Sequence, residues 1–590
     1  MVRRWVWRGD AGAIPRPLED AVADLGLAPS SLLGRLLLNR GIADGASAEA
    51  FLRPTLARGL RAPTLMRDLP RAATRLADAI AAGTPIGVYG DYDVDGITGA
   101  AQLVLFLREL GVDPLLHVSH RGREGYGLHA DALRGLRERG ARVVVTADCG
   151  TANVSELRLA AEIGVDVIVC DHHHAPVTRP PAMALLNPLQ AGCDFPWKGL
   201  SGAGVVFYLL MGLRAELRAR GYASLPDLRR YLDLVALGTV ADVVPLREEN
   251  RVLVAHGLRA LSRTPRPGVV ALKEMALVDE VSVRSVGFRL APRLNAGGRL
   301  ADARVAVELL TSESTERARA LAAELEVHNA ERRALEEAMV ADAIAMADEI
   351  ARTDTRTLVV ARDGWHAGVV GIVAARLAER YHRAALVIAL DGATGRGSGR
   401  SVRSVHLHDA LAECAPLLEA FGGHRQAVGF TIRRDRVAAV AACFEEAVRR
   451  TTHPADLEPR LEIDAEVPLT TITSTVAATL ALLEPHGSGN PAPTLLARGV
   501  TVEGARAVGD PRRSHLKLRL RQDGRTVPAI AFGLGYLPVR AGDRVDVVFT
   551  PRRTRWQGVD RLDVEVIDLR AAAGVEVAQA AENAAEFPVP

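Results

Sequence analysis

The sequence predicts an α/β protein made of two α/β lobes joined by a long helix, with a β-barrel at its C-terminal end. Three observations support this fold class. From residue 85 short apolar runs alternate with helical segments, a second block of this kind begins at 357, and after about 495 the chain contains short alternating strands. A chain of 590 residues is long enough for several domains, because single hydrophobic cores stop growing near roughly 250–300 residues.

The first half of the chain is expected to hold a helical extension, 1–80, and the first lobe, 81–300. Helices are predicted over 30–42 and 68–83 in the extension. In the lobe, strands are predicted at 85–90, 113–119, 141–148 and 165–171, with helices at 97–110 and 155–164. Near-continuous apolar strands that alternate with helices are typical of a parallel sheet covered on both faces.

The second half begins with a long charged helix, expected over 301–352, that bridges the lobes. The second lobe, 353–455, has predicted strands at 357–363 and 384–390 around a helix at 368–381. Five strands, at 496–508, 514–522, 526–532, 543–554 and 562–569, predict a small barrel such as an OB-fold within 458–570. The tail, 571–590, is rich in Ala, Glu and Pro and is expected to fray.

Composition narrows the classes of partner. The net charge is only +2 although 73 residues are Lys or Arg, so any nucleic-acid surface must be local. The five cysteines form no CxxC pair, which argues against a zinc site and indicates a reducing compartment, the cytoplasm. No stretch of about 18 uncharged apolar residues occurs, so we expect no membrane span.

Side chains of types that can bind metal ions follow four apolar runs. We interpret each of these runs as a strand of the first lobe. The side chains are Asp91, Asp93 and Asp95 in DYDVDG, Asp148 in ADCG, Asp171, His172, His173 and His174 in DHHH, and Asp242 in ADVVPL. Each group alone has an ordinary alternative interpretation. DYDVDG could be a calcium loop or a solvated turn, and Asp148 a turn residue. The histidines could be a surface run, and Asp242 a helix cap. Because ligand sites form at the carboxyl edge of such sheets, the four together predict one site.

Phosphodiester hydrolysis suits this set of ligands. Two divalent ions about 3.5–4 Å apart can supply a hydroxide, neutralise charge at phosphorus and assist the leaving oxygen. Mixed carboxylate and imidazole ligands favour Mn²⁺, or Mg²⁺ with more carboxylate and water, over zinc.

These motifs resemble, in order and spacing, the four motifs of the DHH phosphoesterase family. Further segments, among them HRGREGYGL, FRLAPRLNAGGRL, GRGSGRS, GGHRQAVGF and HGSGNPAPT, are similar to its RecJ group. The resemblance covers about 85–493 and implies a DHH domain, a bridging helix, a DHH-associated domain and an OB-fold. It also implies a metal-dependent exonuclease that degrades single-stranded DNA from the 5′ end to mononucleotides, in repair and recombination.

The resemblance also implies roles for individual residues. The implied metal ligands are Asp91, Asp93, Asp95, Asp148, His172 and Asp242. His173 would be the acid or orienting group at the scissile phosphate, and Asp171 a buried partner of a histidine. The implied substrate contacts are Arg121, Asn295, Arg299, Ser398, Arg400, Ser401, Gly423 and His424. The glycines around Ser398 and Arg400 suggest a loop whose backbone N–H groups bind an anion, although a plain turn is the alternative.

The barrel segment 499–570 carries fourteen Lys and Arg against nine Asp and Glu. With His515 and Trp556 nearby, this predicts sequence-tolerant binding of a single strand, although a solvated strand face is the alternative.

Two other functions remain open: a DHH phosphodiesterase of short oligonucleotides or cyclic dinucleotides, and a non-catalytic DHH scaffold that binds DNA. The chain length argues against the first and the complete ligand set against the second. A helicase and a single-strand-binding protein are possible partners, and a monomer is expected.

Overall fold

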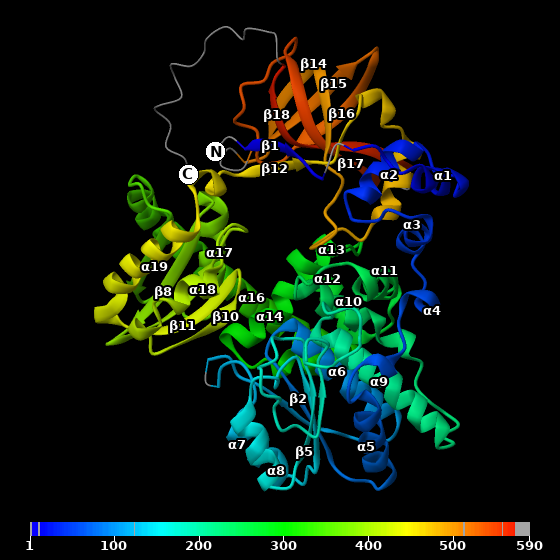
Figure 1. Ribbon diagram of the computed structural model, residues 1–590, viewed down its shortest axis with the longest axis vertical. Helices are drawn as coiled ribbons and strands as arrows, with labels where there is room; N and C mark the ends of the chain where they lie inside the picture. Colours follow the sequence, from blue (N-terminus) through cyan, green and yellow to red (C-terminus); the bar gives the residue numbers. More distant parts are fainter. Residues whose placement is uncertain (1–2, 10–11, 123, 511–513, 557–558, 573–590) are drawn as a thin grey trace. The chain divides into compact units, whose positions relative to one another are not determined.

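The computed structural model describes residues 3–9, 12–122, 124–510, 514–556 and 559–572, without the side chains of 553–561. It divides into two compact units (Figure 1). The first unit comprises 61–459, and the second combines the described residues of 2–60 and 460–590. The region 1–80, expected as one extension, is therefore divided between the units. In the described part of the chain, no helix is both long and apolar enough to cross a membrane.

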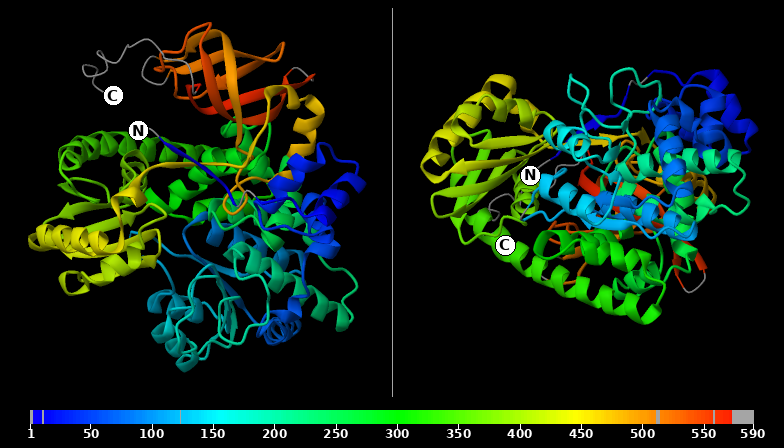
Figure 2. Two further views of the ribbon diagram at one scale, coloured as in Figure 1. Left: turned by 45° about the horizontal axis from the view of Figure 1, so that its top comes forward. Right: turned by 90° about the horizontal axis from the view of Figure 1, so that it is seen from below.

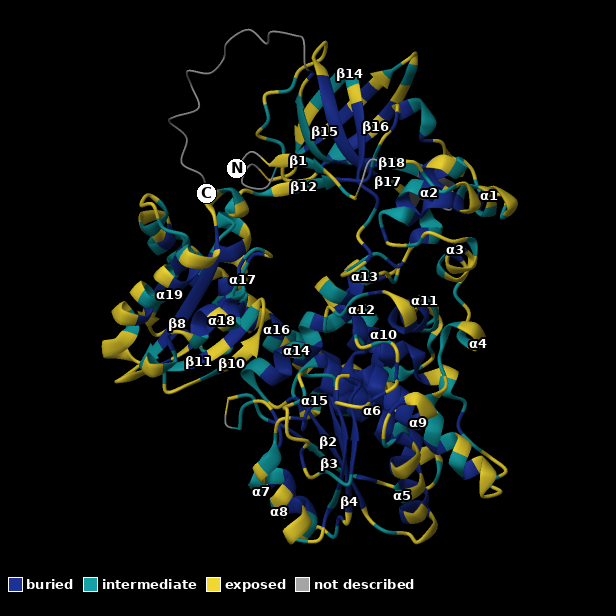
Figure 3. Ribbon diagram, in the orientation of Figure 1, coloured by how far each residue is buried: buried dark blue, intermediate teal, exposed yellow. Residues whose placement is uncertain are grey.

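The first lobe of unit one is built on a parallel sheet with strand order β3-β2-β4-β5-β6. Residues of β2 and β4 are buried along their whole length (Figure 3), as expected for central strands covered by helices. The elements are α5 (Leu69–Ala81), β2 (Ile86–Gly90), α6 (Val94–Glu109), β3 (Leu115–Val118), α7 (Ala130–Glu138), β4 (Val143–Ala147), α8 (Val154–Glu162), β5 (Asp166–Cys170), β6 (Ala184–Leu186) and α9 (Gly202–Ala219).

A helical region follows the parallel sheet. Its helices are α10 (Leu232–Ala241), α11 (Glu248–Arg263), α12 (Pro267–Met275), α13 (Val283–Ser285), α14 (Ala291–Leu300), α15 (Arg304–Thr311) and α16 (Thr315–Ala351). The hydroxyl of Ser314 caps α16 by accepting from the N–H of Arg317. Helix α16 has 37 residues and reaches from the first lobe to the second (Figure 2). The predicted bridging helix is therefore present.

The second lobe has a mixed sheet of order β10-β11-β9-β8-β7, in which only β7 and β8 are parallel. Helices α16 and α17 cover one face, and α18 and α19 cover the other. The elements are β7 (Thr357–Asp363), α17 (Val370–Tyr381), β8 (Ala384–Asp391), β9 (Thr394–Arg400), α18 (Leu407–Ala412), β10 (Ala420–His424), β11 (Ala427–Arg433) and α19 (Val437–Thr451).

Unit two contains the predicted barrel, which closes because β14 pairs with both β15 and β17. Its core also includes Leu18, Leu33 and Leu36 from the N-terminal helices, packed with Leu495 and Phe549. Strand β1 pairs in parallel with β12. The elements are β1 (Arg4–Trp7), α1 (Arg16–Asp24), α2 (Ser30–Leu38), α3 (Gly45–Leu52), α4 (Leu56–Gly59), β12 (Arg460–Ile463), β13 (Ala465–Glu466), α20 (Ser474–Leu480), β14 (Leu495–Val508), β15 (His515–Gln522), β16 (Arg525–Ala531), β17 (Arg544–Trp556) and β18 (Val559–Ala571).

Candidate metal centre and phosphate site

Three of the four predicted ligand segments lie at one edge of the parallel sheet. Asp91 follows β2, Asp148 follows β4 and Asp171 follows β5, and these strands are neighbours in the sheet. Asp148 adopts a left-handed conformation with φ of 67°. An aspartate tolerates this conformation better than most residues, and functional sites commonly retain such strained positions.

The fourth segment reaches the same place from a helix. The interpretation of Asp242 as a residue that follows a strand is wrong, because it caps the C-terminus of α10. Short apolar runs do not distinguish a buried helix from a buried strand. Asp242 Oδ2 nevertheless lies 3.4 Å from His172 Nε2.

Hydrogen bonds fix the three aspartates that follow β2. Asp93 Oδ1 accepts from the N–H groups of Asp95 and Gly96 and so begins α6. Asp95 accepts from the N–H groups of Gly202 at 2.5 Å and Ala203 at 3.0 Å, in the first turn of α9. Asp91 Oδ1 accepts from the Ser119 hydroxyl at 2.9 Å.

The six predicted ligands and His173 form three overlapping groups whose ligand atoms lie within 4.8 Å of one another: Asp91, Asp93 and Asp148; Asp95, His172 and Asp242; and Asp148, His172 and His173. His172 Nε2 is 3.1 Å from Asp148 Oδ1 and 3.8 Å from Asp95 Oδ2. The six predicted ligands therefore gather in one place.

The carboxylates of this cluster are buried and repel one another. Burial raises the pKa of Asp91, Asp148 and Asp242, and the charges of neighbouring aspartates raise it further. Burial and the charge of Asp93 raise the pKa of Asp95 to about 7. Among the described residues, the buried atoms Asp148 Oδ1 and His172 Nε2 have no hydrogen-bond partner. The unpaired donor set and its negative charge fit a divalent cation.

Asp171 holds His173. Its Oδ1 lies 2.8 Å from His173 Nδ1, and its Oδ2 accepts from the N–H of Thr151 at 2.9 Å. Burial opposes a charge on Asp171, but the hydrogen bonds from His173 and Thr151 and the charges of His173 and His172 together outweigh burial and lower the pKa of Asp171. Burial likewise opposes a charge on His173, but the hydrogen bond to Asp171 and the charges of the neighbouring aspartates together raise the pKa of His173 to about 9. The raised pKa favours the protonated form of His173 at neutral pH.

Tyr126 is a site residue that sequence reasoning missed. Its hydroxyl lies 2.7 Å from His173 Nδ1 and donates to the backbone oxygen of Asp148 at 3.2 Å. It stands in HRGREGYGL, the segment that also contains Arg121. A tyrosine between two glycines carries no chemical signal until the fold brings it to a histidine.

Three predicted substrate contacts interact electrostatically and are here called the phosphate cluster: Arg121, Arg299 and Arg400. Burial, together with the charges of Arg121, Arg332 and Arg400, lowers the pKa of Arg299 to about 9. Burial and Arg121 also lower the pKa of Arg400. Arg299 donates through Nη1 to the oxygen of Gly368 at 3.0 Å, which joins the two lobes. Cations held this close are stabilised by an anion.

The expected glycine-rich anion loop around Ser398 is a strand, and this prediction is wrong. Residues Thr394–Arg400 form β9, which pairs on both sides with β8 and β11. Their backbone N–H groups serve the sheet and point alternately to two neighbours, so they cannot converge on one anion. The segment around Gly423 is likewise part of the β10–β11 hairpin.

The remaining predicted substrate residues lie close to the site, and several already have partners. Asn295 Oδ1 accepts from the N–H of Val94 at the start of α6. Ser398 donates to the oxygen of Val428, and Ser401 Oγ lies 3.1 Å from the oxygen of Val402. His424 of the second lobe contacts the first lobe. The centroid of its ring lies 5.6 Å from that of His173 and 5.1 Å from that of His174.

The barrel carries part of the predicted basic surface. Exposed Arg506, Lys517 and Arg519 line a hollow of about 630 Å³ on β14, β15 and β16. His515 packs edge-on against Phe532 at 5.2 Å. The Trp556 side chain lies outside the described residues.

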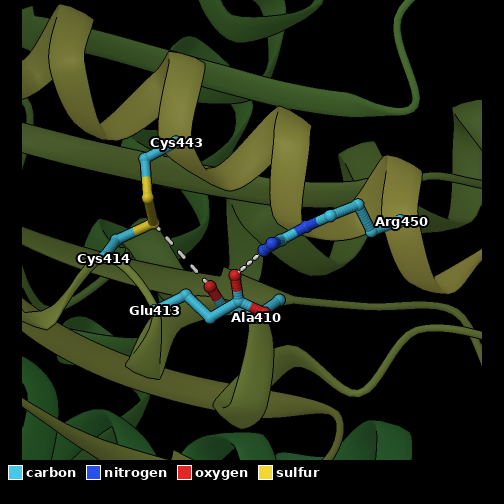
Figure 4. The surroundings of a disulfide bond; sticks show 5 residues. All are labelled: Ala410, Glu413, Cys414, Cys443 and Arg450. Carbon is cyan, nitrogen blue, oxygen red and sulfur yellow. Dashed lines mark hydrogen bonds and ion pairs between the residues drawn. A yellow bond between two sulfur atoms is a disulfide. The ribbon is translucent and has the colours of Figure 1, made fainter.

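Cys414 and Cys443 form a disulfide (Figure 4). They are 29 residues apart in sequence, and the packing of α18 against α19 brings them together. Glu413 and Arg450 form an ion pair beside them. This bond is not what the scattered cysteines indicate, since disulfides are rare in reducing compartments.

Comparison with known proteins agrees with this geometry. Family models match the DHH family N-terminal domain at 85–239, the DHHA1 domain at 354–450 and the RecJ OB domain at 463–568. The single-stranded-DNA-specific exonuclease RecJ of Bacillus subtilis (strain 168) is 36% identical over 92% of this chain and 68% of its own length. That of Escherichia coli K12 is 37% identical over 80% of this chain and 84% of its own.

The chain belongs to the RecJ family. The structure of RecJ from Thermus thermophilus in complex with Mn²⁺ is similar with a TM-score of 0.82 and 32% identity, over 97% of this chain and 80% of that chain. The Mg²⁺ complex of the same protein gives a TM-score of 0.76 and 30% identity. The fold class and the RecJ resemblance predicted from the sequence are thereby confirmed.

Proposed function

We propose that the chain is a metal-dependent exonuclease that degrades single-stranded DNA from its 5′ end and releases mononucleotides. The observation that carries the proposal is the convergence of six carboxylate and imidazole ligands beside a cluster of arginines in a RecJ-family chain. A DNA-binding scaffold needs no such ligand set. An enzyme for very short substrates needs no basic barrel.

In this proposal Asp91, Asp93, Asp95, Asp148, His172 and Asp242 hold two Mn²⁺ or Mg²⁺ ions. Such ions, when bound, supply a hydroxide at neutral pH and neutralise charge at phosphorus. With Nδ1 of His173 turned to Asp171 and Tyr126, its Nε2 is left to carry a proton to the leaving oxygen.

The phosphate cluster binds the terminal phosphate and gives the reaction its 5′ end. Arginines bind phosphate through charged, often bidentate hydrogen bonds. Arg121→Ala or Arg400→Ala should weaken the preference for 5′-phosphorylated over 5′-hydroxyl strands, by about 1.5–3 kcal/mol per lost bond. Equal losses on both strands would show that these arginines contact the chain generally.

The decisive experiment uses one single strand labelled at either end, with Mn²⁺, with Mg²⁺ and with chelator. We expect mononucleotides from the 5′ end in both metals and nothing in chelator. Cleavage limited to the shortest oligonucleotides would favour the phosphodiesterase, and binding without cleavage would favour the scaffold.

We also propose the cytoplasm as the place of action, a monomeric state, and a helicase and single-strand-binding protein as partners. We also propose domain boundaries near residues 300, 352 and 455. In a reducing cytoplasm the Cys414–Cys443 disulfide would be reduced to two thiols. Size-exclusion chromatography tests the monomeric state, and thiol counting on freshly lysed cells tests whether the two cysteines are reduced. Assays for stimulation of cleavage by a helicase or a single-strand-binding protein test the partners.

A further inference from the structure

Helix α16 carries a row of polar side chains whose ends reach both lobes. We call it the α16 ladder; its members are Arg293, Glu326, Asn329, Arg332, Glu336 and Arg376. Arg293 Nε lies 2.6 Å from Glu326, and Asn329 bridges Glu326 and Arg332 at 3.4 and 2.9 Å. Arg332 pairs with Glu336 at 2.8 Å, and Glu336 faces Arg376 at 3.5 Å. Spacings of three and four residues place the α16 members on one face.

The ladder ends on the two helices that hold the phosphate cluster. Arg293 belongs to α14, which also carries Arg299. Arg376 belongs to α17, whose entry loop accepts the Arg299 hydrogen bond at Gly368. A Cβ added to Gly371 of α17 would lie 3.2 Å from Arg400 Nη2, so this helix also packs against Arg400.

The middle of the ladder is buried, whereas Arg376 at its end is 59% exposed. The side chains of Arg332 and Glu336 are only 11% and 13% exposed. Breaking a buried ion pair leaves an uncompensated charge, whereas exposed pairs contribute little. The charge of Arg332 also lowers the pKa of Arg299, so the ladder and the phosphate cluster interact electrostatically.

We propose that the α16 ladder fixes the separation of Arg299 from Arg400 and thereby sets the fit of the site to a terminal phosphate. Arg332 is a positioning residue in this scheme and does not touch the substrate. The inference rests on the proposed function, since it explains how that function recognises its end.

The test is Arg332→Met in the full chain, with Arg333→Met as the matched control. Arg333 is the exposed neighbour on the same helix, so the charge change is identical. On 5′-phosphorylated strands with Mn²⁺, Arg332→Met should raise KM about tenfold and leave kcat within about twofold. Its preference for 5′-phosphate over 5′-hydroxyl should also fall. Arg333→Met should change neither quantity.

Two further measurements separate positioning from direct contact. A phosphate contact of Arg332 itself would lower the salt slope of single-strand binding by about 0.7, whereas a positioning residue leaves it unchanged. Glu336→Gln, which preserves shape, should reproduce the KM effect, and the double variant should be no worse than either single one. The inference would be overturned if Arg332→Met lowered the salt slope of binding, or if the KM effects of Arg332→Met and Glu336→Gln were additive. Equal KM and end preference in Arg332→Met and Arg333→Met would also overturn it. A wild-type protein that cleaves nothing would instead overturn the proposed function.

Discussion

His173 Nδ1 lies within hydrogen-bonding distance of both Asp171 Oδ1, at 2.8 Å, and the Tyr126 hydroxyl, at 2.7 Å. Because the same hydroxyl donates to the backbone oxygen of Asp148, one tyrosine connects the proposed proton carrier to a strand end of the metal centre. The ring of His173 is thus held at Nδ1 by two groups, and Nε2 points away from both of them.

Tyr126→Phe should therefore lower kcat about tenfold on single strands while KM and the Mn²⁺ affinity stay close to wild type. Only the hydroxyl is removed, and no metal ligand changes. Tyr381→Phe, which removes a hydroxyl bonded to Asp348 on α16, is the control and should have no effect on turnover. Loss of Mn²⁺ binding in Tyr126→Phe would mean that the tyrosine supports the metal centre and not the histidine.

Gly202 leaves room for the metal centre, because a Cβ there would lie 2.7 Å from both Cβ and Oδ1 of Asp148. Gly202→Ala should displace this carboxylate and weaken Mn²⁺ binding by about tenfold or more, as seen by calorimetry. Gly135→Ala is the matched control, since a Cβ at Gly135 on α7 meets nothing within 4 Å. That change should stabilise the protein by about 0.5–1 kcal/mol. Undiminished Mn²⁺ affinity in Gly202→Ala would remove Asp148 from the ligand set.

The metal-free protein should lose stability as the pH rises from 6.5, the ordinary pKa of histidine, to about 9, the raised pKa of folded His173. Groups with a raised folded pKa bind more protons in the folded state, so the free energy of unfolding falls across this window. Asp95, with a pKa of about 7, acts in the same direction. Burial lowers the pKa of His172 to about 3, so below pH 6.5 this histidine makes the free energy of unfolding rise with pH.

Urea unfolding in chelator between these pH values measures this effect. Added Mn²⁺ should stabilise the protein more at the upper end than at the lower, because the carboxylates are then ionised. A free energy of unfolding that rises with pH across the window in chelator would contradict the charge assignment.

A fragment of residues 61–459 should fold and cleave short strands. Truncation after residue 459 alone would strip Leu18, Leu33 and Leu36 of their partners in the barrel and should cause aggregation. Removal of residues 1–60 as well avoids this. The fragment should bind long strands more weakly, with a salt slope lower by about 0.7 for each lost phosphate contact. Unchanged affinity and slope would assign the barrel a structural or protein-docking role.

Sequence reasoning found the strand-end ligands because two signals coincide at Asp91, Asp148 and Asp171: an apolar strand and a carboxylate directly after it. It assigned Asp242 to the wrong element because α10 is buried on all sides and shows no helical periodicity. It interpreted the glycines around Ser398 as a loop, whereas small residues there let Phe430 pack across the sheet, since a Cβ on Gly397 would lie 2.1 Å from its ring.

Other features have no local signal at all. The N–H groups of Gly202 and Ala203 hold Asp95 from more than a hundred residues away. The shared core of the N-terminal helices and the barrel, and the Cys414–Cys443 disulfide, likewise depend on contacts between distant segments. The roles of the site residues remain predictions.

Turnover of a 5′-phosphorylated single strand by Asp148→Ala in saturating Mn²⁺ tests the central claim most directly. Asp148 belongs to two of the three ligand groups, and its Oδ1 is buried without a hydrogen-bond partner among the described residues. The account predicts that hydrolysis is nearly abolished while the protein stays folded, because like charges repel less in the metal-free cluster. Wild-type turnover by this variant would contradict the two-metal assignment.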